Sequence, residues 1–91
     1  MRFWVCVGGG PHPIEADDAE EAAEKAAERD HSDSGEPLDE YDATVLAPDG
    51  EVTRHEVRVE YSPDFYAHPH DKEPHANVVE SLRRCAEGHV G

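Results

Sequence analysis

Basic residues and long hydrophobic runs are both scarce in this chain of 91 residues. It carries 8 lysines and arginines against 22 aspartates and glutamates, which gives a formal net charge of −14 at pH 7. Because a polyanion repels phosphate, this balance disfavours direct binding to nucleic acid or to an anionic membrane. No apolar run approaches the roughly 20 residues that cross a bilayer, and the apolar start of the chain is too short for the core of a signal peptide. We therefore expect a cytoplasmic protein.

Cysteine is scarce too, since the chain contains only Cys6 and Cys85. Small secreted domains that depend on disulfides usually carry more cysteines, and the spacing of these two matches no zinc or redox motif. We interpret both as small side chains in or near the core, with a disulfide between them as the alternative. The length fits one domain, residues 1–91. Hydrophobic residues make up only 36% of the chain, so the core should be thin and a homodimer would bury more surface.

The pattern of apolar residues predicts a small α+β fold. Apolar and β-branched side chains predict a strand over residues 2–7, and alanines at helical spacing predict a helix over about 17–29. A Pro-Asp-Gly turn predicts a hairpin over about 41–61, and a second helix is expected over about 77–87. The element order is therefore β-α-β-β-α. We expect a three-stranded, largely antiparallel sheet with both helices packed on one face.

Three connecting segments have the composition of loops. Residues 8–13 hold three glycines and two prolines, which break a strand. Residues 30–40 are rich in serine and acidic side chains, so we expect a mobile loop there. Residues 62–76 are rich in histidine and proline, and a loop of that length is uncommon unless it has a function.

The acidic residues are concentrated rather than spread. Thirteen of them lie between Glu15 and Asp42, where the only basic residues are Lys25 and Arg29. The alanines of the first helix form one apolar stripe, which leaves the acids on the solvated side. Asp17 is the expected N-cap, because an aspartate there accepts hydrogen bonds from the first turn.

Carboxylates spaced along a rigid helix are similar in charge to the phosphates of DNA, and a nucleic-acid-binding protein has a basic surface that receives such a pattern. We therefore hypothesise a non-catalytic inhibitor that binds the basic nucleic-acid site of another protein. The residues expected to make this contact are Asp17, Asp18, Glu20, Glu21, Glu24, Glu28, Asp33, Glu36, Asp39, Glu40 and Tyr41.

In size, charge and lack of catalytic motifs, the chain is similar to phage-encoded inhibitors of restriction and CRISPR effectors, with which it shares no motif residues. The similarity implies a phage or mobile-element protein that acts in the host cytoplasm, either as a DNA mimic or as a steric block of a defence complex. An alternative explanation of the acidic bias is adaptation to salt in an interaction domain of a host protein.

A histidine-rich metal-binding module is a further alternative. Imidazole and thiolate are good ligands for Zn²⁺, Ni²⁺ and Cu²⁺. The weak candidates are His68, His70, His75, Cys85 and His89. No spacing among them matches a known closed site, so we favour surface histidines in a polar loop and expect no metal and no cofactor.

Recognisable catalytic groupings are absent from the sequence. There is no His-Glu-x-x-His run and no Ser/His/Asp grouping in a strand-turn-helix context. His55 and Glu56 are adjacent in a predicted strand, so they point to opposite faces and cannot form a dyad. We therefore do not expect an enzyme.

Overall fold

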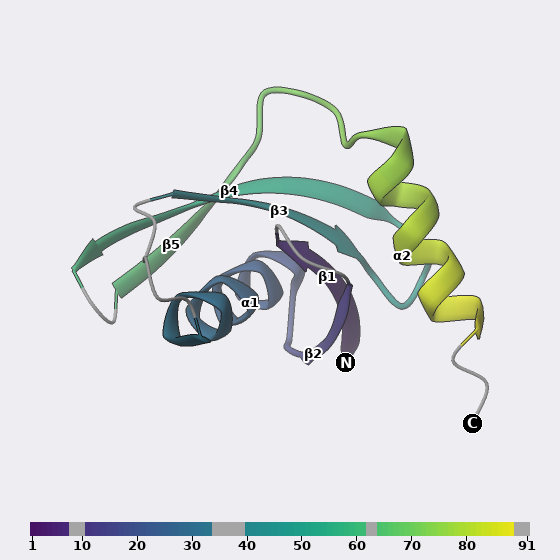
Figure 1. Cartoon of the computed structure of the whole chain (residues 1–91), viewed down its shortest axis with the longest axis horizontal. Coiled ribbons are helices and arrows are strands. Elements are labelled where there is room, and N and C mark those ends of the chain that lie inside the picture. The colour runs from purple at the N-terminus through teal and green to yellow at the C-terminus, as the bar shows by residue number, and fades with distance from the viewer. Residues whose placement is uncertain (8–10, 34–39, 62–63, 89–91) are drawn as a thin grey trace.

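A five-stranded antiparallel sheet forms the centre of the molecule (Figure 1). The computed structural model describes residues 1–7, 11–33, 40–61 and 64–88. Its elements, in chain order, are β1 (Arg2–Val7), β2 (His12–Glu15), α1 (Ala19–Asp33), β3 (Glu40–Leu46), β4 (Val52–Tyr61), β5 (Asp64–Pro69) and α2 (Ala76–Gly88). In space the strands follow the order β2-β1-β3-β4-β5.

The expected α+β class and antiparallel pairing are confirmed, but the expected number of three strands is wrong. The two further strands, β2 and β5, lie at the edges of the sheet, in segments whose composition predicted loops. β2 contains Pro13 and β5 ends on Pro69. Proline has no N–H to donate, so within sheets it is found mainly at edges. Pro13 and Pro69 therefore make the two segments resemble loops in the sequence, and they are compatible with edge positions in the sheet.

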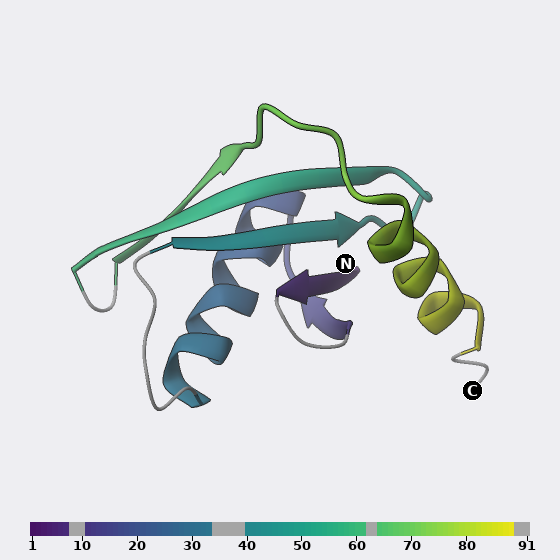
Figure 2. The same cartoon turned by 45° about the horizontal axis from the view of Figure 1, so that its top comes forward.

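Helix α1 covers one face of the sheet (Figure 2), and its alanine stripe forms the contact. Ala22, Ala23 and Ala27 have no exposed surface. They pack in one cluster with apolar side chains of the strands, among them Val5 and Val45, which are partners across β1 and β3. Because an alanine side chain is small, the helix can lie close to the sheet, and its acidic side is turned to solvent.

Helix α2 lies against the opposite face, so the expectation that both helices share one face is wrong. Side chains alternate between faces along a strand. Trp4 and Leu46, which are partners across β1 and β3, therefore lie on the reverse of Val5, and they line a hollow together with side chains of α2. Leu82 of α2 is fully buried. Since β1 carries apolar residues on both faces, each face needs a cover.

The predicted hairpin turn is confirmed. Gly50 adopts a φ of +96°, in the left-handed region that glycine occupies at little cost. Its N–H donates to the carbonyl of Ala47 at 3.0 Å, and the N–H of Glu51 donates to Oδ1 of Asp49, also at 3.0 Å. The turn joins β3 to β4, which form the middle of the sheet.

Helix α1 is longer and begins later than the sequence indicated. Its N-cap is Asp18 and not Asp17, because Oδ1 of Asp18 accepts a hydrogen bond from the N–H of Glu21 at 2.7 Å. The helix continues to Asp33, through the first part of the predicted mobile loop; residues 34–39 lie outside the described residues. In the described ranges, no helix is long and apolar enough to span a membrane.

Candidate functional site

The outer side of α1, together with Asp17 just before its N-cap, presents four of the carboxylates that were expected to make the contact. We call Asp17, Glu20, Glu21 and Glu28 the acidic face. Asp17, Glu20 and Glu28 are exposed and Glu21 is half-buried. Glu20 and Glu28 are eight residues apart, which corresponds to about 12 Å along a helix that rises about 1.5 Å per residue. Because the acidic face belongs to a helix packed on a sheet, its carboxylates are held on a rigid support.

The charges of the acidic face are only partly neutralised. Nζ of Lys25 lies 2.9 Å from Oε1 of Glu21, and this hydrogen bond raises the pKa of Lys25. Lys25 also donates to the backbone carbonyl of Glu15 at 2.8 Å. Within the described part of the chain, no ion pair engages Asp17, Glu20 or Glu28. Three carboxylates thus remain available to a cationic partner.

Glu24, expected to belong to the same surface, has a structural contact instead. Its Oε2 accepts a hydrogen bond from the backbone N–H of Ala67 at 3.0 Å. Ala67 belongs to β5, an edge strand, and an unpaired N–H at a sheet edge invites pairing with another chain. The side chain of Glu24 therefore ties α1 to β5 and satisfies one edge donor. Sequence reasoning could not find this contact, because the two residues are 43 positions apart.

Some of the other expected contact residues have structural roles, and others lie outside the described residues. Asp18 caps α1, and Glu40 is an exposed residue at the start of β3 whose Oε1 lies 3.6 Å from Nε of Arg58. Tyr41 is only 4% exposed and its hydroxyl lies 3.1 Å from Nδ1 of His31, so it belongs to the core. Asp33 is the last residue of α1. Glu36 and Asp39, which were also expected to make the contact, lie outside the described residues.

The metal candidates are not brought together in the described ranges. No group of three or more histidine, cysteine, aspartate or glutamate side chains there could hold a metal ion. His68 is exposed on β5, and Nδ1 of His70 accepts a hydrogen bond from the N–H of Lys72 at 3.0 Å. Cys85 lies on α2, and His89 is outside the described residues.

Asp42 and Arg54 form an ion pair on the face of the sheet opposite α1. Nε of Arg54 donates to Oδ1 of Asp42 at 2.9 Å, and a second nitrogen of Arg54 bonds the other oxygen of that carboxylate. Arg54 also donates to the backbone carbonyl of Glu73 at 3.0 Å, and its side chain is only 8% exposed. The hydrogen bond to Arg54 lowers the pKa of Asp42. The pair fixes the segment before α2 to the sheet and so has a structural role.

His55 is a buried histidine on the side of α1. It is 5% exposed, its Nε2 lies 2.9 Å from Oγ1 of Thr53, and its Nδ1 has no hydrogen-bond partner among the described residues. Burial lowers the pKa of His55, although the nearby charges of Glu20 and Asp18 oppose this effect. The sequence placed His55 in a strand, but its burial beneath the acidic end of α1 depends on tertiary packing.

Comparison with known proteins gives no relative from which a function could be transferred. No family model matches the chain, and no curated protein or solved structure is significantly similar to it.

Proposed function

We propose that the protein is a non-catalytic inhibitor whose acidic face binds the basic nucleic-acid site of a defence complex and excludes the nucleic acid. The observation that carries the proposal is the concentration of solvent-facing carboxylates on one side of α1, with three of them outside any ion pair of the described structure. A source in a phage or mobile element belongs to the same proposal.

Charge complementarity supports this choice of partner. Double-stranded DNA carries a phosphate about every 3.4 Å along each strand, so the roughly 12 Å between Glu20 and Glu28 spans the axial length of three to four phosphates. The acidic face has three carboxylates over that length, Glu20, Glu21 and Glu28, so a basic channel that binds DNA by charge would meet a comparable number of negative charges. Long-range attraction between opposite charges also accelerates encounter.

Rigidity supports it as well. The alanines beneath α1 are buried, Asp18 caps its N-terminus, and Glu24 fastens its middle to β5. Carboxylates on a fixed helix lose less conformational entropy on binding than carboxylates on a flexible tail. The positions of the charges are thus set before the partner arrives.

The test compares two variants that change the net charge equally. In the first, Asp17→Asn, Glu20→Gln, Glu21→Gln and Glu28→Gln neutralise the acidic face. In the matched control, four exposed carboxylates elsewhere are neutralised: Glu51→Gln, Asp71→Asn, Glu73→Gln and Glu87→Gln. Each protein is titrated into a panel of DNA-bound restriction and CRISPR effectors, and DNA release is followed by fluorescence anisotropy.

We expect the parent chain to displace DNA from an effector with an affinity that falls steeply as salt rises. Rim charge pairs contribute about 0.2–1 kcal/mol each, so the loss of four pairs should weaken binding of the acidic-face variant by about fourfold to several hundredfold. The control should stay within about twofold of the parent. Equal losses in the two variants, or no displacement by the parent in the whole panel, would contradict the proposal.

A further inference from the structure

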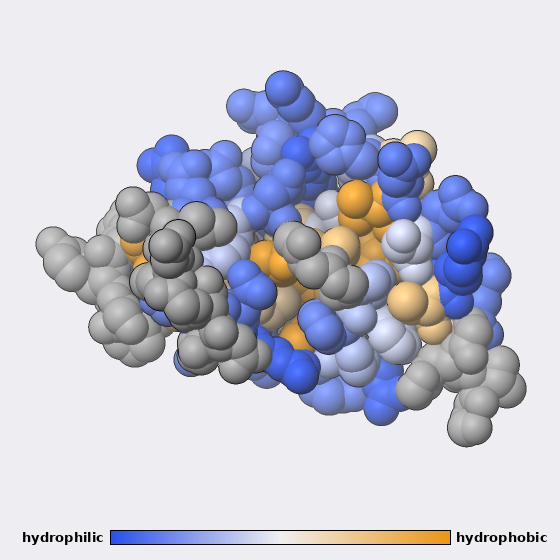
Figure 3. Space-filling view, viewed as in Figure 1, coloured by the Kyte–Doolittle hydropathy of each residue, from blue (hydrophilic) through white to orange (hydrophobic). Residues whose placement is uncertain are grey.

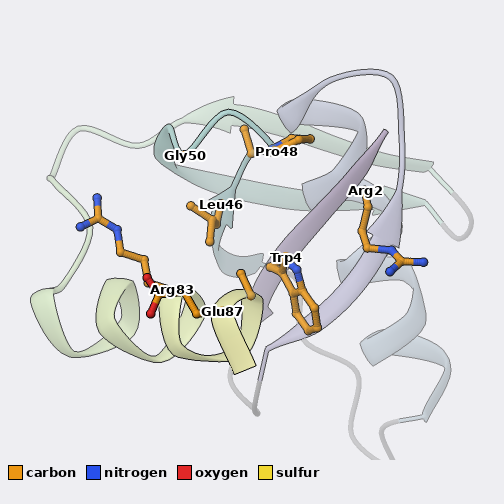
Figure 4. Close-up of a pocket in the computed structure, with 9 residues that line it drawn as sticks. Arg2, Trp4, Leu46, Pro48, Gly50, Arg83 and Glu87 are labelled. Atoms are coloured by element: carbon orange, nitrogen blue, oxygen red, sulfur yellow. The ribbon is translucent and has the colours of Figure 1, made fainter. Parts of the chain in front are cut away.

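A second surface feature lies on the opposite side of the sheet from the acidic face. A hollow of about 490 Å³ opens between the start of β1, the turn that joins β3 to β4, and the last turns of α2 (Figure 4). Small-molecule sites commonly occupy about 300–1,000 Å³. In the space-filling view, hydrophobic side chains reach the surface near the middle of the molecule and beside α2, with hydrophilic ones around them (Figure 3).

The hollow has an apolar wall with an aromatic ring. Trp4, Leu46, Pro48 and Ala86 line it, and the indole of Trp4 extends along its edge beside the end of α2 (Figure 4). The residue is half-buried. Aromatic rings favour offset-stacked or edge-to-face partners, beyond the area that they bury. This wall therefore suits a flat, apolar group.

The charged residues of the hollow depart from the balance of the whole chain. Two arginines, Arg2 and Arg83, line it with a single acid, Glu87, in a chain of net charge −14. Nε of Arg2 lies 3.5 Å from Oε1 of Glu15, whereas Arg83 takes part in no ion pair in the part of the chain that the structure describes. Glu87 lies one helical turn further on and offsets part of this charge, but the guanidinium of Arg83 can still pair with a carboxylate or similar anion.

The carboxylates of α1 weaken this local charge little. They lie on the outer side of a helix that packs on the far face of the sheet, so both the helix and the sheet separate them from the hollow. Exposed charges more than a Debye length apart, about 8–10 Å at physiological ionic strength, are largely screened. The nearest charges to an anion in the hollow are therefore Arg2, which is paired with Glu15, and Arg83 and Glu87.

We propose that this hollow is a binding site for a small aromatic anion, whose ring lies against Trp4 and whose anionic group pairs with Arg83. Leu46 and Ala86 supply apolar contact, and Arg2 adds positive charge at the other end. The site does not involve the acidic face, so it stands independently of the proposed inhibitor function.

The test uses a pair of ligands that differ in charge. 2-Naphthoate and 2-naphthamide have nearly the same shape, but only the first carries a negative charge at neutral pH. Trp4 is the one tryptophan in the chain, so its indole N–H gives a single cross-peak in a ¹H–¹⁵N spectrum. We expect 2-naphthoate to shift this peak saturably, together with the backbone amides of Leu46 and Ala86. 2-Naphthamide should bind several-fold more weakly.

Neighbouring arginines provide the matched controls. Arg83→Ala should weaken 2-naphthoate binding by about tenfold and abolish the preference over 2-naphthamide. Arg84→Ala removes the same charge one residue away, from a side chain whose nitrogen lies 2.8 Å from Oε1 of Glu80 and which does not line the hollow, and it should leave the preference intact. Both variants change exposed residues, so unfolding should not obscure the result.

Three outcomes would overturn the proposal. The first is the absence of a saturable shift with 2-naphthoate. The second is equal affinity for the two ligands, which would leave an apolar hollow without selectivity for anions. The third is an equal loss of 2-naphthoate binding in Arg83→Ala and Arg84→Ala, which would show that binding depends on the net charge of the protein and not on Arg83 itself.

Discussion

The hydrogen bond between Glu24 and Ala67 allows a sharp test of how α1 is held on the sheet. Replacing Glu24 by alanine removes the acceptor for the backbone N–H of Ala67, 3.0 Å away in the edge strand β5. Glu28, one helical turn further on, is exposed, and its side chain makes no hydrogen bond within the described ranges. Glu28→Ala therefore removes the same kind of charge from the same helix without removing the tie to β5.

The magnitude follows from the nature of the bond. A hydrogen bond to a charged group contributes about 1.5–3 kcal/mol, and the half-buried position of Glu24 places this one near the lower end. Alanine is the better helix former by a few tenths of a kcal/mol, which offsets part of the loss equally in both variants. Because that offset cancels between the two variants, we expect Glu24→Ala to lower the free energy of unfolding by about 1.5 kcal/mol relative to Glu28→Ala, or Tm by about 6–12 °C.

Urea unfolding followed by circular dichroism would measure the difference, and hydrogen exchange would locate it. In Glu24→Ala the amide of Ala67 should exchange faster than in the parent, whereas Glu28→Ala should leave its protection unchanged. Glu24→Gln, which keeps an acceptor oxygen without the charge, should fall between the parent and Glu24→Ala. Equal stabilities of the two alanine variants, with unchanged exchange at Ala67, would refute the reasoning.

Three further predictions concern buried groups. Because burial lowers the pKa of His55 from 6.5, this imidazole takes up a proton less readily in the folded state than in the unfolded chain. The free energy of unfolding should therefore be fully retained above pH 6.5. Below pH 6.5 it should decrease by at most about 1.4 kcal/mol per pH unit from this group. Urea unfolding measured from pH 5 to 7.5 should show a weaker dependence of the free energy of unfolding on pH in His55→Gln than in the parent. Leu82→Ala should lower the free energy of unfolding by about 2–5 kcal/mol, and Leu82→Met should lower it by less than about 1.5 kcal/mol, as thermal unfolding would measure. Equal losses in the two variants would contradict tight packing around Leu82. Burial, with the nearby charges of Cys85 and Asp42, raises the pKa of Cys6. In Cys85→Ser, where Cys6 is the single thiol, iodoacetamide should therefore modify Cys6 at pH 7.5 more slowly than it modifies glutathione. Mass spectrometry would measure both rates.

Local patterns were sufficient for the elements that carry a clear period or turn signal. The alanine stripe of α1 and the Pro48-Asp49-Gly50 turn were both placed from the sequence, because the physics that forms them acts within a few residues. The edge strands were missed for the opposite reason. β2 and β5 both contain proline and are only four and six residues long, and they form because a neighbouring strand supplies their partners.

The candidate site shows the same division. The concentration of acids on α1 was visible in the sequence, but their separate uses were not. Glu24 bonds a residue of β5, Asp18 caps the helix in place of Asp17, and Tyr41 packs in the core. Each of these roles depends on which segments meet in space. The arginines of the hollow, Arg2 and Arg83, come from opposite ends of the chain, so no local pattern could have joined them.

Strand β1 carries apolar side chains on both faces, and each face is covered by a different helix. Val5 packs beneath α1, while Trp4, the adjacent residue, faces α2 and the hollow. One peptide unit therefore separates the anionic helix from the aromatic wall. Because Val5 points to one face and Trp4 to the other, a substitution at either residue should disturb the packing of one helix and leave that of the other in place.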